Sequence, residues 1–173
     1  GREVRGLLAG KFSAERPTVS RRLQSVDGTI TWLLRFADGN EAECVYIPDK
    51  TRGTLCISSQ VGCTLTCRFC HTVAQQLVRN LSIDEMCAQL VLSMDELNDW
   101  PAGKPGRRLT NIVLMGMGEP LFNYENVAAA VRIIMSGEGV AISKRRITLS
   151  TSGVVPEIKR CGAELGVNLA ISL

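Results

Sequence analysis

Apolar, strand-like segments alternate with helix-like segments from residue 54 onward, and this order constrains the fold more than any other feature of the sequence. The expected strands are residues 54–58, 110–115, 146–150 and 167–173, and the expected helices are residues 82–100, 123–135 and a short one from Pro156 to about Cys161. Strands separated by helices at this spacing form parallel βαβ units with right-handed crossovers. The sequence therefore predicts an α/β fold with a partial barrel of about four parallel strands.

The first expected helix has clear signals at both ends. Ser82 and Glu85 have the spacing of a capping box, in which each side chain accepts a hydrogen bond from the other residue's backbone N–H. Pro101 and Gly103 are expected to end the helix. One stripe at helical spacing predicts its buried face: Ile83, Met86, Cys87, Leu90, Val91, Met94 and Leu97.

Residues 21–47 have a different pattern, which predicts a β-meander. Three strand-like runs, residues 21–26, 29–36 and 41–47, are separated by Asp27-Gly28 and Asp38-Gly39. Asp-Gly between two such runs is a strong signal for a β-hairpin.

Composition excludes several protein classes. The 173-residue chain is 45% hydrophobic and 21% charged, with no low-complexity tract, no membrane-length apolar run and no signal-peptide pattern, so we expect a soluble cytoplasmic protein. A net charge of +3 does not by itself indicate nucleic-acid binding. Three short basic runs are expected to be solvated surface: Arg21-Arg22, Arg107-Arg108 and Lys144-Arg145-Arg146.

Seven cysteines, an odd number in a chain without a secretory signal, argue against a disulfide framework and favour metal binding or thiol chemistry. Cys44, Cys56, Cys87 and Cys161 stand apart from the other three and are expected to act as small buried hydrophobic residues.

The remaining cysteines form one group with the spacing Cys63-x3-Cys67-x2-Cys70. A structural zinc site needs four protein ligands. A 4Fe–4S cluster held by three thiolates instead leaves its fourth iron open for a substrate or cofactor, and soft cysteine ligands suit either metal centre. His71 directly follows Cys70 and would hardly reach the opposite corner of the same site.

Unusual loops follow the expected parallel strands one after another. In parallel α/β folds, functional groups gather after the carboxyl ends of strands. The cysteine group follows the first strand, "GMGEP" (116–120) the second and "STSG" (150–153) the third, and the fourth ends in Ser172 and Leu173. We therefore expect these four segments to meet at one site. The glycines of "GMGEP" allow close approach of a ligand, and Glu119 suits the ammonium group of an amino acid.

The cysteine spacing, with the aromatic Phe69 directly before the last cysteine, is similar to the radical SAM signature. The runs "CISSQVGCTLTCRFCHT", "LVRNL", "MGMGEPLFNY", "SKRRITLSTSGVVP" and "LAISL" closely resemble the RlmN/Cfr family, whose members are radical SAM enzymes that methylate adenine in large-subunit ribosomal RNA. The resemblance extends from about Asp27 to Leu173. It implies that the α/β part is the beginning, about four strands, of a TIM-like radical SAM barrel, preceded by the small β-meander.

The resemblance also implies a division of the chain. Residues 1–20 would be a remnant of an N-terminal accessory domain or a linker, residues 21–50 a β-meander extension, and residues 51–173 the N-terminal part of the radical SAM core. Because the chain stops in an apolar strand before the second half of the barrel, we expect a piece of a longer protein. The family's methyl-carrying cysteine would then be missing, and Cys161, on a helix of the first half, does not replace it. The piece alone is expected to be inactive.

Roles follow from the resemblance residue by residue. The missing cysteine receives a first methyl group, and a radical formed from a second S-adenosylmethionine takes hydrogen from it. The resulting carbon radical adds to adenine, Glu43 accepts a proton, and Cys56 resolves the protein–RNA crosslink by forming a disulfide. The implied cluster ligands are Cys63, Cys67 and Cys70, and the implied S-adenosylmethionine contacts are Gly118, Glu119, Ser150, Ser172 and Leu173.

The two implied catalytic residues also have simpler interpretations. Glu43 shares a strand face with Val45 and Ile47, and an apolar environment disfavours a charged carboxylate, which suits a general base. The alternative is a water-exposed glutamate at the rim of the fold. Cys56, seven residues before Cys63, is either a core thiol or points to the same site as the cysteine group.

The implied partners are 23S ribosomal RNA, transfer RNA in the ribosomal methylase branch, and an electron donor for the cluster, with no membrane and a monomeric protein. Methylation at adenine C2, as in that branch, is favoured over C8, as in the resistance branch. Two other hypotheses remain. One is a zinc-stabilised nucleic-acid-binding module that uses the three clustered cysteines with His71 or Cys56, and the other is a radical SAM enzyme with a different substrate.

Overall fold

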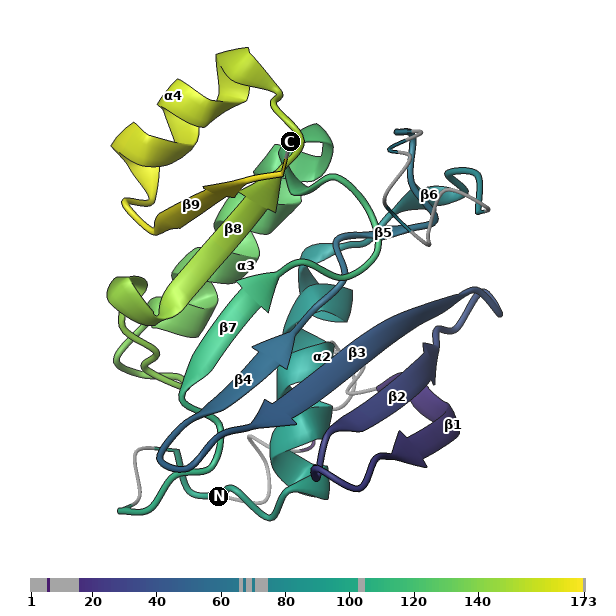
Figure 1. Ribbon diagram of the computed structural model, residues 1–173, viewed down its shortest axis with the longest axis vertical. Helices are drawn as coiled ribbons and strands as arrows, with labels where there is room; N and C mark the ends of the chain where they lie inside the picture. Colours follow the sequence, from purple (N-terminus) through teal and green to yellow (C-terminus); the bar gives the residue numbers. More distant parts are fainter. Residues whose placement is uncertain are drawn as a thin grey trace.

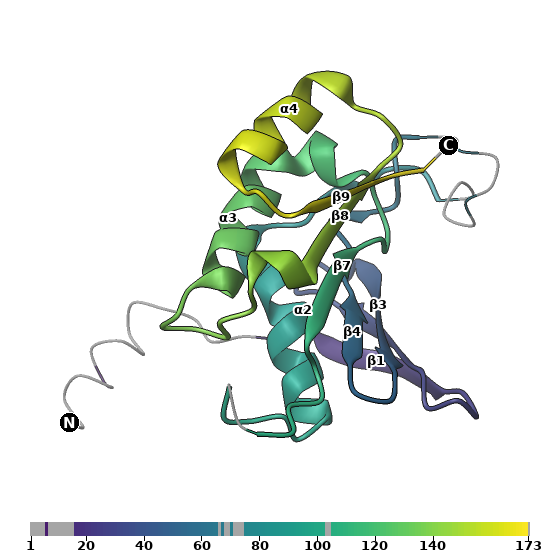
Figure 2. The ribbon, with the colours of Figure 1, turned by 60° about the vertical axis from the view of Figure 1, so that its left-hand side comes forward.

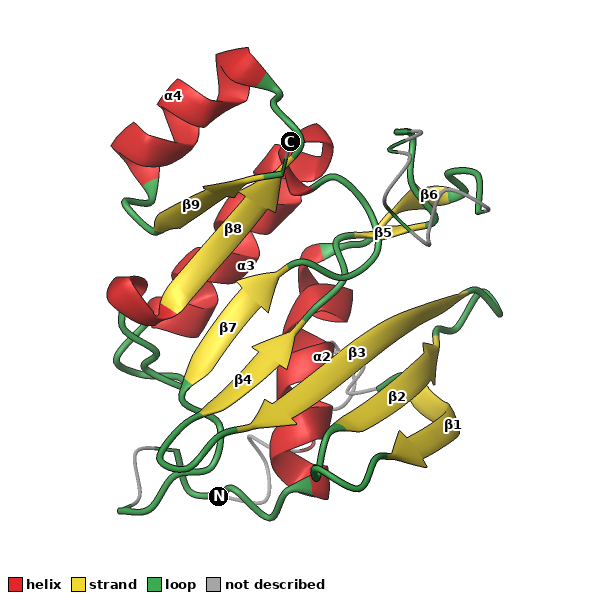
Figure 3. Cartoon of the chain, in the orientation of Figure 1, coloured by secondary structure: helices red, strands yellow, loops and turns green. Residues whose placement is uncertain are grey.

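A mixed seven-stranded sheet organises the molecule (Figure 1; Figure 3). The structure is a computed structural model that describes residue 6 and residues 16–65, 67, 70, 75–102 and 105–172. The predictions on Phe69, His71, Gly103 and Leu173, and on most of residues 1–20, lie outside the described residues. In spatial order the strands are β1 (Thr18–Gln24), β2 (Ile30–Arg35), β3 (Glu41–Pro48), β4 (Gly53–Cys56), β7 (Asn111–Leu114), β8 (Ile147–Thr151) and β9 (Asn168–Ile171).

The first three strands form the predicted antiparallel meander. In the first turn, the Asp27 carboxylate accepts a hydrogen bond of 3.0 Å from the backbone N–H of Thr29, and Gly28 has a φ of 88°. The second turn repeats this arrangement with Asp38, Gly39 and the backbone N–H of Asn40. A short polar acceptor and a residue that tolerates positive φ are what a tight hairpin needs, so the Asp-Gly signals are confirmed.

Strand β4 joins the meander to the parallel part of the sheet. It pairs antiparallel with β3, where Cys56 lies opposite Val45, and parallel with β7, where Cys56 lies beside Val113. Strands β7, β8 and β9 continue in parallel. The predicted α/β class is therefore confirmed. The sheet runs without interruption across residues 50 and 51, and the proposed domain division there stays a prediction.

Helix α2 (Ile83–Glu96) begins with the predicted capping box. The Ser82 hydroxyl accepts a hydrogen bond from the backbone N–H of Glu85, and the Glu85 carboxylate accepts one of 2.9 Å from the backbone N–H of Ser82. The helix ends at Glu96, with Leu97 as its C-cap, several residues before Pro101. No helix in the described part of the chain is long and apolar enough to cross a membrane.

Two further helices follow β7 and β8, and two short 3-10 helices precede α3 and β8. Helix α3 is Tyr124–Met135, preceded by the 3-10 helix η2 (Pro120–Asn123), and η3 is Lys144–Arg146. Helix α4 (Val155–Glu164) has Pro156 in its first turn, as predicted, and extends beyond the expected end at Cys161.

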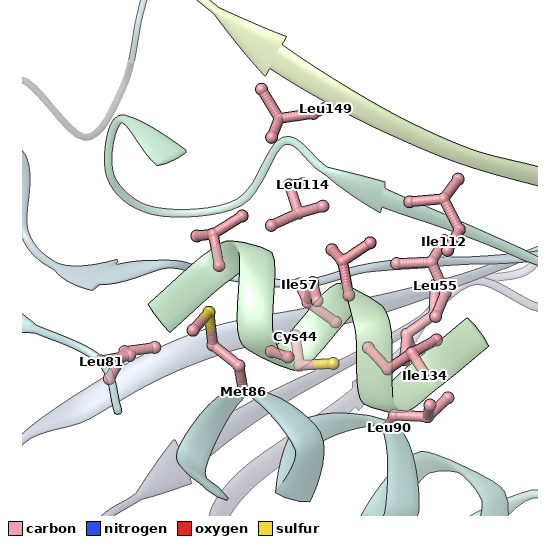
Figure 4. Packing of buried hydrophobic residues seen from close by; sticks show 14 of the residues in the cluster. Cys44, Leu55, Ile57, Leu81, Met86, Leu90, Ile112, Leu114, Ile134 and Leu149 are labelled. Carbon is pink, nitrogen blue, oxygen red and sulfur yellow. The ribbon is translucent and has the colours of Figure 1, made fainter. Parts of the chain in front are cut away.

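Helices α2 and α3 cover one face of the sheet (Figure 1; Figure 2). Alternate strand residues point toward them and are buried, and the packing includes Leu55, Ile112 and Leu149 from three neighbouring strands (Figure 4). Within the part of the chain that the structure describes, no helix covers the opposite face (Figure 2). Side chains on that open face, including those of Glu43 and Cys56, are half-buried or exposed.

Candidate functional site

A pocket of about 370 Å³ opens at the carboxyl ends of the parallel strands. All four of the loop segments that the sequence singled out contribute to it, so the prediction that they meet at one site is confirmed for the described residues. The lining residues are Cys63, Leu65, Cys67, Cys70, Leu114, Met115, Gly116, Gly118, Glu119, Pro120, Ser150, Thr151, Ser152, Ala170 and Ser172.

The cysteine loop is closed at its base by two strands that the sequence analysis missed. Strands β5 (Gln60–Val61) and β6 (Arg79–Asn80) pair antiparallel on the two sides of the loop. Closer to the cysteines, the backbone N–H of Cys63 donates a hydrogen bond of 3.1 Å to the carbonyl oxygen of Gln75. This pairing fixes where the loop leaves the fold and returns to it.

Arg79 ties the base of the cysteine loop to the rest of the protein. Its guanidinium forms a bidentate ion pair with Glu85, at 2.7 and 2.8 Å, and donates a hydrogen bond of 2.6 Å to Asp38 in the β2–β3 turn. It also lies 5.6 Å from the ring centre of Phe36. The hydrogen bond from Arg79 is the main reason why the pKa of Asp38 lies well below its usual range. One side chain therefore joins β6, the start of α2 and the meander.

Glu119 is buried, and its carboxylate braces two of the pocket loops together. One oxygen accepts a hydrogen bond of 3.0 Å from the backbone N–H of Leu121, which caps η2. The other accepts bonds of 2.9 and 3.0 Å from the backbone N–H and the hydroxyl of Ser152. A carboxylate can accept about four hydrogen bonds, so these three leave room for one further donor. The bracing role was not predicted from the sequence.

Gln60 connects the "GMGEP" loop to the base of the cysteine loop. Its side-chain oxygen accepts a hydrogen bond of 2.9 Å from the backbone N–H of Glu119, and its amide nitrogen donates one of 2.7 Å to the side chain of Asn80. Gly118 lies directly against it with a φ of 96°, and a Cβ at that position would be 2.5 Å from the Gln60 Cβ. The glycine is therefore required both by its backbone conformation and by the close approach of Gln60.

A second buried amide, that of Asn123, holds together the two chain segments at the base of the cysteine loop. The Asn123 side chain donates hydrogen bonds of 2.8 Å to the carbonyl oxygens of Ser59 and Leu81, which flank the β5–β6 pair. Sequence reasoning assigned no role to Gln60 or Asn123. The only signal available was a polar side chain next to each candidate loop.

Ser150 and Ser172 lie side by side at the far wall of the pocket. Their hydroxyl oxygens are 3.2 Å apart, because β8 and β9 are paired in parallel and end at the same level. The backbone N–H of Ser172 donates to the carbonyl oxygen of Thr151. Leu173, the other residue expected here, lies outside the described residues.

Cys56 and Glu43 do not line the pocket. Cys56 is half-buried on the open face of the sheet, and its burial raises the pKa of its thiol, to which the nearby charge of Glu43 adds. Glu43 itself is exposed, on the same face as the half-buried Val45 and the exposed Ile47. The prediction that an apolar environment surrounds Glu43 is wrong for this structure, because that strand face is not the one that packs against the helices.

The expectation that the other separate cysteines are small buried residues is confirmed for two of the three. Cys44 and Cys161 are buried and Cys87 is half-buried, and burial raises the pKa of Cys44 to about 12. Cys161 does not contribute to the pocket.

The three clustered cysteines have the chemistry of a metal centre. All of them line the pocket, and all are free thiols. Soft thiolates in this number suit an iron–sulfur cluster with one iron open toward the rest of the pocket. Among the described residues, no three His, Cys, Asp or Glu side chains are already close enough together to hold one metal ion. The fit of the three cysteines to a cluster thus rests on the chemistry of their thiols and on the pocket that they share.

Comparison with known proteins identifies similar chains over the whole length. The profile of the radical SAM superfamily matches residues 57–171. The chain is 62% identical, over its full length, to the Dual-specificity RNA methyltransferase RlmN of Rhodospirillum rubrum, of which it covers 41%. It is 57% identical, over 99% of its length, to the protein of the same name from Rhizorhabdus wittichii, of which it covers 43%. The chain thus spans about two fifths of the length of these relatives.

A solved structure has the same fold. The crystal structure of a radical SAM methyltransferase from Sphaerobacter thermophilus superimposes on the entire chain with a TM-score of 0.90 and 43% sequence identity, and the chain covers 50% of it. The predicted barrel fragment therefore has a direct structural counterpart.

Proposed function

Because the chain belongs to the radical SAM superfamily, we propose that it is the N-terminal part of the catalytic core of an RNA methyltransferase. The observation that carries the proposal is the meeting of three thiols, a buried glutamate and two serines in one pocket. The Rhodospirillum rubrum relative, named as a dual-specificity RNA methyltransferase, supports RNA as the substrate. We propose adenine in large-subunit ribosomal RNA and in transfer RNA, with methylation at C2.

Each pocket residue has a task in this proposal. Cys63, Cys67 and Cys70 would hold a 4Fe–4S cluster, which when bound would supply an open iron for S-adenosylmethionine and the electron that cleaves it. Glu119 lines the same pocket and has one acceptor position left, which would be available to the ammonium group of that cofactor. Gly118, whose missing Cβ leaves room for Gln60, would offer its backbone to the cofactor, and the hydroxyls of Ser150 and Ser172 would offer polar contacts in the same pocket.

Cys56 and Glu43 would act on the RNA side of the reaction. The proposed intermediate is a covalent bond between RNA and a methylated cysteine outside this chain. In its release, the Cys56 thiolate attacks the sulfur of that cysteine and a disulfide forms, and the electron pair of the broken carbon–sulfur bond stays on the former methylene carbon, which takes up a proton to become the methyl group. Glu43 takes the proton from the adenine carbon. Because the pKa of Cys56 is raised, its thiol must lose a proton to a general base, or its environment must change, before it can act as a nucleophile.

Metal content tests the ligand assignment. Anaerobic reconstitution of the chain with iron and sulfide should give about four irons per chain and the broad absorption of a cluster. Cys67→Ala should bind almost no iron, whereas Cys87→Ala, which removes a half-buried thiol on α2, should keep the full iron content. One tightly bound zinc in place of iron would support the zinc-stabilised module and contradict the proposal.

The role of Cys56 is tested in the full-length enzyme with RNA and S-adenosylmethionine. Cys56→Ala should retain its cluster and its cofactor cleavage but accumulate protein that is covalently attached to RNA. This adduct is visible as a slow, nuclease-sensitive band on a denaturing gel. Cys87→Ala is the matched control and should turn over normally. Normal methyladenosine formation by Cys56→Ala, measured by mass spectrometry, would return Cys56 to a packing role.

A further inference from the structure

A second, strongly basic pocket lies at the other end of the sheet. It has a volume of about 370 Å³ and is lined by the β3–β4 turn and the segment that leads into β7. These two segments lie next to each other at the end of the sheet where β4 and β7 begin (Figure 1). Strand β4 separates it from the candidate site, because the turn precedes β4 and the cysteine loop follows it. The lining residues are Tyr46, Pro48, Asp49, Lys50, Thr51, Arg52, Gly106, Arg107 and Arg108.

Both backbone segments of this basic pocket are held in place. In the β3–β4 turn, the backbone N–H of Asp49 donates a hydrogen bond of 2.7 Å to the carbonyl oxygen of Arg52. On the other side, the buried carboxylate of Asp99 accepts bonds of 2.9 and 2.8 Å from the backbone N–H groups of Arg108 and Leu109. The charged side chains therefore project from two fixed supports. A binding site built this way loses little entropy when a ligand arrives.

Four cations face one carboxylate in this pocket. Lys50, Arg52, Arg107 and Arg108 line it together with Asp49. No carboxylate in the described part of the chain lies within ion-pair distance of any of the four cations. Asp49 accepts a hydrogen bond of 2.7 Å from the backbone N–H of Lys50. The nearby Asp99 carboxylate, which does not line the pocket, also acts on Arg107 through its charge, so the two carboxylates offset part of the positive charge and leave a net excess of it.

The Arg107 guanidinium is only partly satisfied by hydrogen bonds. Its Nη1 donates a hydrogen bond of 2.9 Å to the carbonyl oxygen of Val140. Its Nε and Nη2 are buried and have no hydrogen-bond partner among the described residues. Burial lowers the pKa of this guanidinium, and the nearby charge of Arg146 adds to the effect, whereas the nearby Asp99 carboxylate opposes it. The prediction that Arg107-Arg108 is solvated surface is thus correct for Arg108, which is exposed, and wrong for Arg107.

We propose that this basic pocket binds a phosphate oxyanion through Lys50, Arg52, Arg107 and Arg108. An oxyanion would compensate the charge of the four side chains, and guanidinium groups match phosphate oxygens in geometry. The phosphate can belong to an RNA backbone or be free in solution. An RNA with one nucleotide at the candidate site could reach the basic pocket along the open face of the sheet, because β4, the strand between the two sites, is only four residues long, roughly 13 Å. The RNA source rests on the proposed function, whereas the oxyanion site itself does not.

The test compares two charge-matched double variants. Lys50→Ala/Arg52→Gln removes two cations from the rim of the basic pocket, and both side chains are exposed, so the fold should persist. Arg21→Gln/Lys159→Ala removes two exposed cations, one on β1 and one on α4, that do not line the basic pocket, and is the control. Circular dichroism and thermal unfolding establish that both variants are folded.

Inorganic phosphate is the first probe. Titration into isotope-labelled chain, followed by amide NMR shifts, should perturb Thr51 and Gly106 in the unchanged protein and in the control, but not in Lys50→Ala/Arg52→Gln. A fluorescein-labelled RNA hairpin is the second probe, with anisotropy measured over a range of KCl concentrations. The slope of log affinity against log salt is negative. If the RNA backbone occupies the pocket, the magnitude of this slope should be smaller by about 1 to 2 for the pocket variant, and by less for the control.

Each result has a defined meaning. Phosphate shifts that depend on Lys50 and Arg52, with an RNA slope that does not, support the oxyanion site and assign it to a free phosphate. Absence of RNA binding by every variant, with phosphate shifts intact, contradicts the proposed RNA substrate but leaves the oxyanion site in place. Equal effects of the pocket and control variants, or no phosphate shift in the unchanged protein, would overturn the proposal.

Discussion

Replacing Glu119 by Gln is the sharpest test of how the candidate pocket is held together. The carboxylate accepts three hydrogen bonds, one from Leu121 and two from Ser152. An amide has only one oxygen, so its NH₂ group must face a donor. If the oxygen stays with Ser152, the backbone N–H of Leu121 becomes a buried donor without a partner. Losing one charge-assisted bond and weakening two others should lower the free energy of unfolding by about 2–4 kcal/mol.

Urea unfolding of the metal-free chain, followed by circular dichroism, measures this loss. Ser152→Ala removes only the hydroxyl bond and should cost about 1 kcal/mol. Because both residues share the same bonds, Glu119→Gln should cost less in the Ser152→Ala background than in the unchanged protein. The exposed Glu138→Gln is the control and should change the free energy of unfolding by less than about 0.5 kcal/mol. If Glu119→Gln costs no more than this control, the bracing role is refuted.

Three further changes probe other parts of the structure. Gly118→Ala should destabilise by about 2 kcal/mol or more in urea unfolding, because its Cβ would lie 2.5 Å from a neighbouring side chain, whereas Gly39→Ala, with positive φ and open space, should cost less. Arg79→Ala should raise the pKa of Asp38 toward its ordinary value in an NMR titration, and an unchanged pKa would contradict the ion-pair geometry. Burial raises the pKa of Cys44 from its ordinary value of 9.0 to about 12 in the folded protein, because the buried thiolate is disfavoured. The contribution of the Cys44 thiol to the free energy of unfolding is therefore fully present below about pH 9 and is lost as the pH rises toward 12. Cys44→Ala should flatten this alkaline decline.

The features that local chemistry determines could be predicted from the sequence. The Asp-Gly turns, the Ser82–Glu85 capping box and the order of strands and helices all depend on residues close together in the chain. The meeting of four loops in one pocket was also predictable, because parallel strands end at the same edge of a sheet.

What the sequence could not show depends on long-range pairing. Strands β5 and β6 have two residues each, too few for a periodic pattern, and they pair across the cysteine loop. The environment of Glu43 was misjudged because alternation identifies two strand faces but not which one meets the helices. The basic pocket joins Lys50 and Arg52 to Arg107 and Arg108, and only the parallel pairing of β4 with β7 brings these distant segments together.

The position of β4 between two kinds of neighbour also bears on the order of assembly. Its antiparallel partner β3 is reached through a turn of a few residues, whereas its parallel partner β7 lies beyond the cysteine loop and α2, with Thr54 paired to Asn111. Closing the shorter loop costs less chain entropy. We therefore expect the hairpins β1 to β4 to form first and β7 to add to the edge that β4 provides. We expect the cysteine loop, which lies between β4 and β7, to be enclosed only when β7 joins this template, so that its thiols stay accessible to a metal donor until then.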